Sequence, residues 1–225
     1  YVAFNSTSGP GYFEEGLGHG MSTGLDASTM THELSNTGTN AFTFAQVPWT
    51  ARTVGDDETN DHPSFVGSKL EQAFFHNNRL GFLSNDNVSM SQAAEFFNMY
   101  HTSAQTITDA DPIDLKATST KPVVLHSVLP STQGLVLFSA NQQFLMGAND
   151  GILTPSKSVI RAIANYEMDT VIDPVDTGTT INFISKTPSY TRVFAMVTRG
   201  ENENPQVADI GRVVNEWVPA TVDTM

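Results

Sequence analysis

The sequence contains no cysteine. Disulfide frameworks, cysteine-ligated zinc sites and cysteine nucleophiles are therefore excluded, and cysteine usage gives no sign of an oxidising compartment. The fold must be held by buried apolar side chains, and a chain of 225 residues is long enough to build a sizeable core from them.

Basic residues are scarce. The chain has 11 Lys and Arg against 24 Asp and Glu, a formal net charge of −13, and the few cations do not cluster. Proteins that grip nucleic acid tightly do so by neutralising phosphates and releasing counterions, which requires a basic face. The composition therefore argues against tight DNA or RNA binding.

Long apolar runs are also lacking. A membrane-spanning helix needs roughly 18 apolar residues in a row, whereas runs such as Leu135–Phe138 are only long enough for a strand. We expect no membrane span. The chain begins at Tyr1 without a basic-then-apolar leader, and we interpret it as an internal segment of a longer protein.

What the sequence does contain is a recurring pattern, clearest in Leu70–Met90, which reads as two strands joined by polar turns. An apolar pair followed by a serine, a polar turn and a second apolar strand occurs at Ser84, Ser139 and Ser185. A period of roughly 40–50 residues built from antiparallel strands is typical of a β-propeller blade, although a β-sandwich also produces strand-turn-strand units. We predict one all-β region over 1–225, a partial β-propeller with long loops and blade-like units near 64–100, 120–150 and 178–200.

Individual strands follow from short apolar or alternating segments between Gly, Pro and Asn clusters. Residues 91–100 are expected to form a turn and a short strand, and 158–172 a strand, although the apolar positions there also fit one face of a helix. Long loops are expected at 16–24, 48–63 and 108–114. The other expected strands cover 1–4, 12–15, 41–47, 122–129, 135–139, 143–146, 179–185, 192–198 and 210–218.

The usual signatures of catalysis and cofactor binding are not found. The six histidines do not have the short spacings of a zinc site, and no Gly-x-Ser-x-Gly motif presents a nucleophile. The glycine-rich stretches 16–24 and 147–151 lack the lysine that phosphate-binding loops use. We therefore assign no catalytic, cofactor-binding or metal-ligating residue, expect no cofactor, and do not expect an enzyme.

Two acidic groups leave alternatives open. Asp56, Asp57, Glu58 and Asp61 supply the oxygen atoms that Ca²⁺ prefers, but without the spacing of an EF-hand loop, so a solvated or interface loop is the simpler interpretation. Asp109, Asp111 and Asp114 contain enough carboxylates for a glycosidase pair, but acids in a tight turn commonly accept hydrogen bonds from backbone amides.

Trp49 and Arg52 stand three residues apart in the long loop 48–63. They fit either a cation–π contact or a buried anchor of the loop, and we favour the anchor.

Several short motifs, taken in order, resemble one protein family. The chain is similar over about residues 1–185 to the tail nozzle proteins, or tail tubular proteins B, of short-tailed T7-like bacteriophages. The motifs that carry the resemblance are Ser28-Thr29-Met30, His32-Glu33-Leu34, Trp49-Thr50-Ala51-Arg52, Gly55-Asp56, Pro63-Ser64-Phe65-Val66-Gly67, Asn78-Arg79-Leu80-Gly81-Phe82-Leu83-Ser84, Asp109-Ala110-Asp111-Pro112-Ile113-Asp114, Leu137-Phe138-Ser139 and Leu153-Thr154-Pro155-Ser156.

The resemblance implies a structural subunit of the virion tail. Such a subunit forms a homo-hexameric tube through which double-stranded DNA leaves the capsid without being bound tightly, and it contacts the adaptor ring of tail tubular protein A and the tail fibres. An acidic wall suits a conduit, because it repels the phosphates that pass it. We expect loops 16–24 and 48–63 to supply ring contacts. The alternatives are a tail-associated carbohydrate-active hydrolase using Asp109, Asp111 or Asp114, and a Ca²⁺-dependent binding module built on Asp56–Asp61.

Overall fold

The computed structural model describes residues 1–6, 9–148, 151–198, 203–214 and 217–225. The all-β prediction is confirmed: every regular element in these ranges is a strand, and all strand pairs are antiparallel. Within the same ranges, no helix is long and apolar enough to cross a membrane. The strands are β1 (Val2–Asn5), β2 (Tyr12–Glu15), β3 (His32–Gly38), β4 (Ala41–Gln46), β5 (Gln72–His76), β6 (Arg79–Ser84), β7 (Asn87–Met90), β8 (Ile113–Lys116), β9 (Leu125–Ser131), β10 (Gly134–Ser139), β11 (Gln143–Gly147), β12 (Val159–Ala164), β13 (Val175–Asp176), β14 (Ile181–Lys186), β15 (Thr191–Val197) and β16 (Gln206–Asp209).

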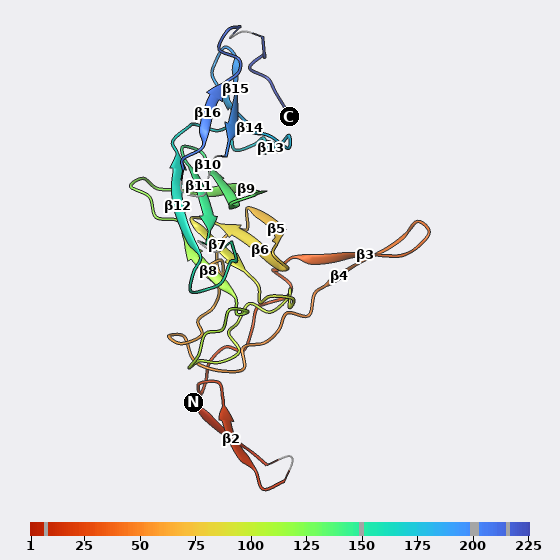
Figure 1. The fold of residues 1–225 in the computed structure, drawn as a ribbon. Helices are drawn as coiled ribbons and strands as arrows, with labels where there is room; N and C mark the ends of the chain where they lie inside the picture. Colours follow the sequence, from red (N-terminus) through yellow and green to blue (C-terminus); the bar gives the residue numbers. More distant parts are fainter. Residues whose placement is uncertain (7–8, 149–150, 199–202, 215–216) are drawn as a thin grey trace.

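Three four-stranded sheets make up the body of the molecule. Each is a meander of consecutive strands, β5-β6-β7-β8, β9-β10-β11-β12 and β13-β14-β15-β16. The remaining four strands form two separate hairpins, β1-β2 and β3-β4, which project from the body in different directions (Figure 1). A four-stranded meander is the unit from which propeller blades are made.

The middle sheet is buried on both faces, and β10 shows why. Side chains alternate across a strand, so Leu135 and Leu137 join the core cluster shared with β6, β7 and β8, whereas Val136 and Phe138 join the cluster shared with β14 and β15. All four side chains are at most 1% exposed. Burying a side chain of this size contributes about 1.5–3 kcal/mol, and the continuous apolar run therefore joins the three sheets into one stack.

The outer face of the β5–β8 sheet is covered by irregular chain rather than by another sheet. Phe82 points away from the middle sheet and packs with Phe65, Met30 and Met99, which come from three separate loops. Its ring lies 5.5 Å from that of Phe65 in an edge-to-face arrangement, a geometry that aromatic pairs favour. The long loops are thus folded onto the sheet as a third core layer.

Three local predictions are wrong. The stretch 70–90 contains three strands, β5, β6 and β7, rather than two, because the polar turns at 77–78 and 85–86 are tight hairpins in which Asn78 and Asn85 adopt positive φ. Residues 91–100 form turns and one isolated bridge, Gln92 with Glu95, without the expected short strand. The apolar stretch in 158–172 is a strand only over 159–164.

The expected strand at 210–218 is also wrong over the residues described. The sheet ends with β16 at Asp209, which pairs with Phe194, and the amide of Val214 then donates to Gly211 in a turn. Val213 is 94% exposed, so the β-branched residues there have no neighbouring strand to pack against. Residues 215–216, and parts of the expected loops at 147–151 and 200–205, lie outside the described residues.

Candidate assembly surface

The β3–β4 hairpin carries an apolar face without a partner. Cross-strand pairing places Leu34 opposite Phe44 and Asn36 opposite Phe42, so that the three apolar side chains share one side. They are 65%, 69% and 62% exposed for Leu34, Phe44 and Phe42 respectively. The hairpin extends beyond the body over most of its length (Figure 1). Contiguous exposed apolar surface of this kind marks an interaction site.

The opposite face of the same hairpin is polar. It presents Glu33, Ser35 and Thr43, and the hydroxyl of Ser35 donates to the Glu33 carboxylate at 2.7 Å. At the base of the apolar face, the His32 ring stacks on Phe44 with ring centres 5.0 Å apart. An isolated two-stranded hairpin is at best marginally stable in water, so this hairpin gains from a surface that covers its apolar side.

The β1–β2 hairpin is also rich in exposed aromatic side chains. Phe4 and Phe13 pair across the strands with ring centres 5.2 Å apart, and both are exposed. The hairpin is tied to the body at its base, where the Glu15 carboxylate accepts hydrogen bonds from the Ser103 hydroxyl at 2.9 Å and the Ala104 amide at 2.8 Å.

The acids of the 48–63 loop hold the loop itself together. The Asp56 carboxylate accepts hydrogen bonds from the backbone amides of Glu58 and Thr59, both at 3.0 Å, and from the Thr59 hydroxyl. The Glu58 amide, followed by the Thr59 hydroxyl and amide, lowers the pKa of Asp56 below its ordinary value. Asp61 accepts from the His62 amide at 2.6 Å.

Arg52 is the buried anchor of this loop, as the sequence led us to expect. Its guanidinium donates to the carbonyls of Ser22 and Asn60 and to the Asp57 carboxylate, the last at 2.8 Å. The residue is 1% exposed and its guanidinium also lies 6.0 Å from the Tyr100 ring centre. A buried guanidinium needs such acceptors, since an unpaired buried charge is costly.

Asp111 and Asp114 likewise bind backbone groups of their own chain. The buried Asp111 carboxylate accepts from the Thr108 amide at 2.7 Å and from the Thr102 hydroxyl at 3.1 Å. Burial acts to raise the pKa of Asp111, but the hydrogen bonds from Thr108 and Thr102 outweigh it and the pKa is lowered. The Asp114 carboxylate accepts from both the amide and the hydroxyl of Ser64.

These acids therefore do not present a pair of carboxylates to a ligand, which a glycosidase would need. Over the described parts of the chain, no three His, Asp or Glu side chains are grouped in a way that could hold a metal ion. Each acidic cluster that the sequence drew attention to has a role in loop geometry.

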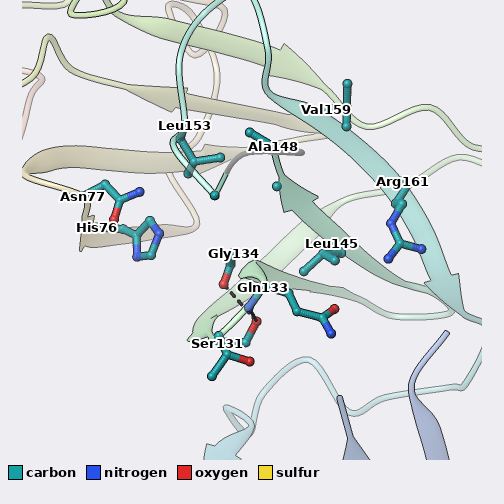
Figure 2. A pocket seen from close by; sticks show the side chains of 13 residues that line it. His76, Asn77, Ser131, Gln133, Gly134, Leu145, Ala148, Leu153, Val159 and Arg161 are labelled. Carbon is teal, nitrogen blue, oxygen red and sulfur yellow. Dashed lines mark hydrogen bonds between the residues drawn. The ribbon is translucent and has the colours of Figure 1, made fainter. Parts of the chain in front are cut away.

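A cavity of about 550 Å³ lies where turns from the first two sheets of the stack meet. In Figure 2, Leu153 and Ala148 lie on one side of it, Gln133 and Ser131 on the opposite side, and His76 and Arg161 at its flanks. Burial lowers the pKa of His76 below its ordinary 6.5, so the ring is neutral at pH 7. The residues that line the cavity include no Asp or Glu, in a chain with 24 of them.

Comparison with known proteins decides the family. The family model described as "Bacteriophage nozzle protein" matches residues 1–225. The chain belongs to the bacteriophage nozzle protein family. As a nozzle protein it is a structural component of the virion tail, and the resemblance seen in the sequence motifs is confirmed.

A curated relative agrees with the family match. The nozzle chain is 32% identical over 194 residues to "Tail tubular protein gp12" of Escherichia phage T7, an alignment that covers 85% of this chain and 24% of the relative. The chain thus spans about a quarter of the length of the curated relative it matches.

The unpartnered face of the β3–β4 hairpin was not identified from the sequence. Phe42 and Phe44 alternate with polar residues and predict a half-buried strand, and β4 does form there. The pattern does not tell whether the apolar side is covered by the same chain, because that depends on the position of the hairpin relative to the body. The expectation that loops 16–24 and 48–63 supply ring contacts stays a prediction.

Proposed function

We propose that this chain is part of the wall of the tail tube through which the phage genome leaves the virion, and that its role is structural rather than catalytic. The single observation that carries the proposal is the match of the nozzle family over residues 1–225. The name of the T7 relative, a tail tubular protein, supports a tube as the assembled form.

The tube is a homo-hexamer in this proposal, with the adaptor ring of tail tubular protein A and the tail fibres as further partners. Ring closure requires heterologous contacts, in which each subunit offers two different surfaces. The two projecting hairpins, each with exposed aromatic residues, are consistent with a subunit that is not covered by its own chain alone.

The net charge suits passage of DNA rather than its binding. A phosphate contact made by Lys or Arg would have to be broken for each step of the moving duplex, whereas an acidic wall repels the backbone and leaves it free to slide. With a net charge of −13 and 11 Lys and Arg in total, the chain has little means of holding DNA.

The three meanders fit the unit structure of a propeller, and we propose the blade-like units near 64–100, 120–150 and 178–200 as its parts. They overlap the three sheets in order, and the sheets stack face to face through the β10 side chains. A rigid stack of this kind suits a tube wall, since close-packed interiors deform little.

Neither alternative has comparable support. The hydrolase hypothesis needs two free carboxylates at a cleft, while Asp111 and Asp114 bind backbone amides and hydroxyls. The calcium-module hypothesis needs oxygens aimed at one point, while Asp56 binds the amides that follow it.

Electron microscopy of the assembled protein at its natural length tests the proposal. A closed six-fold ring with an axial hole, found below the adaptor in purified tails, is the expected result. A stable monomer that hydrolyses carbohydrate, or a position outside the tail axis, would overturn it.

A further inference from the structure

We propose that the apolar face of the β3–β4 hairpin docks on a second copy of this chain, against the side formed by β12 and the loop before it. The inference rests on the proposed ring of identical subunits and adds to it the two surfaces that meet. The hairpin residues are Leu34, Phe42 and Phe44, and the receiving segment is 151–166.

The receiving side offers apolar surface of its own. Ile152 and Val159 are 64% and 56% exposed, and β12 is the edge strand of the middle sheet. The mouth of the cavity in Figure 2 adjoins them, lined here by Leu145, Leu153 and Val159. At about 550 Å³ it lies within the range of roughly 300–1,000 Å³ typical of pockets that take up an apolar group.

The two surfaces differ in charge. Residues 151–166 contain Lys157 and Arg161 and no acid, an exception in a chain of net charge −13. The hairpin, from His32 to Gln46, contains Glu33 and neither Lys nor Arg. A negative rim around an apolar patch therefore meets a positive rim around another, which favours the pairing and fixes its orientation.

The two surfaces also lie on different sides of the subunit. In Figure 1 the hairpin projects from one side of the body, and β12 lies along the other side. Surfaces that are complementary and separated in this way join subunits head to tail and close into a ring, whereas a self-complementary patch would give a two-fold dimer.

DNA is a poor alternative occupant for the hairpin. Its exposed groups are apolar or acidic, and it lacks the cations that phosphate binding requires. The other occupants, a further segment of the same polypeptide or a different tail protein, are separated by the experiment below.

Cross-linking between single-cysteine variants tests the contact in rings of the protein at its natural length. The 225 residues contain no cysteine, so each introduced thiol is unique within them. Thr39→Cys, at the exposed hairpin tip, is mixed with Ser156→Cys, on the receiving loop, and treated with a short bismaleimide. Thr39→Cys mixed with Val171→Cys, an exposed site elsewhere, is the matched control.

The expected product is a covalent dimer from the Thr39→Cys and Ser156→Cys mixture, and little from the control mixture or from either variant alone. Both substitutions in one chain should give a ladder of linked subunits that ends at the size of the ring. A cross-link within one chain, a cross-link only to another tail protein, or equal yield with Val171→Cys would overturn the inference.

A second variant measures the apolar contribution. Phe42→Ser combined with Phe44→Ser should weaken ring formation about tenfold or more by analytical ultracentrifugation. Phe4→Ser with Phe13→Ser removes the same chemistry from the other hairpin and should have a smaller effect. Unaltered rings in the first variant contradict the docking site but leave the tube intact, whereas a wild-type protein that never forms rings refutes both.

Discussion

The guanidinium of Arg79 donates a hydrogen bond to the backbone carbonyl of Asp111 at 2.7 Å, inside the protein and 32 residues away along the chain. The same side chain donates to the carbonyls of Ser91 and Asp109, both also at 2.7 Å. Arg79 is 2% exposed, and burial lowers its pKa below the ordinary 12.5. One side chain at the start of β6 thus holds two loops onto the sheet.

Replacing Arg79 by Met should destabilise the fold severely. Three carbonyls would lose their donor inside the protein, and a buried unsatisfied polar group costs about 1–3 kcal/mol. We expect the free energy of unfolding to fall by at least about 3 kcal/mol in chemical denaturation. Arg192→Met, at an exposed position on β15, is the matched control and should change it by about 0.5 kcal/mol or less.

Leu137 and Leu34 allow the same substitution to be compared inside and outside the core. Leu137 is fully buried in the middle sheet and Leu34 is 65% exposed on the hairpin. Leu137→Ala should cost about 2–5 kcal/mol, because it removes buried methyl groups and leaves a cavity, while Leu34→Ala should have little effect on the subunit alone. Equal losses in thermal unfolding of the unassembled protein would show that the hairpin is part of the core.

Acid should weaken the fold in part through Asp111. Its pKa is lowered from the ordinary 3.8 in the folded state, so its contribution is fully present above the unfolded pKa of 3.8 and is lost as the pH falls through the lower, folded value. Asp111→Asn should therefore show a shallower decline of the unfolding free energy below about pH 4 than the wild type. Parallel curves from urea titrations at pH 3 to 6 would contradict this assignment.

Gly134 and Gly178 share a positive φ but differ in the space around them. A Cβ at Gly134 would lie 2.2 Å from the Met146 carbonyl oxygen, whereas at Gly178 nothing lies within 4 Å. Gly134→Ala should cost more than Gly178→Ala, which carries only the backbone strain of about 1–2 kcal/mol. Chemical denaturation of both variants measures the difference, and equal costs would mean that the turn before β10 can open.

Removal of divalent cations should leave the fold unchanged. The Asp56 carboxylate already accepts hydrogen bonds from the amides of Glu58 and Thr59, so it does not depend on a metal for partners. The midpoint of thermal unfolding in excess chelator should equal that in added Ca²⁺. A higher midpoint with Ca²⁺ would indicate a ligand that binds the folded state, and would revive the calcium-module hypothesis.

The sequence predicted the body of this protein well where one segment carried enough information by itself. The run from Leu135 to Phe138 is apolar at every position and forms a strand buried on both faces. Where a strand needs a particular neighbour, the same reasoning failed. Val213 has the β-branched side chain of a strand residue, but beyond Asp209 no strand lies beside it.

The candidate site was harder to predict for a related reason. Phe42 and Phe44 indicate an amphipathic strand, and nothing in their spacing distinguishes a face covered by the same chain from one left for a second molecule. The role of Arg79 was equally hidden, because its three acceptors are backbone carbonyls, which every residue possesses.

The consecutive order of strands within each sheet bears on how the protein is made. Each meander draws only on neighbouring stretches of chain, so a sheet has all its hydrogen-bonding partners as soon as its fourth strand has emerged from the ribosome. Short-range pairing of this kind closes quickly and keeps strand edges exposed only briefly. A tail component that is needed in many copies during one infection benefits from folding in the order of its synthesis.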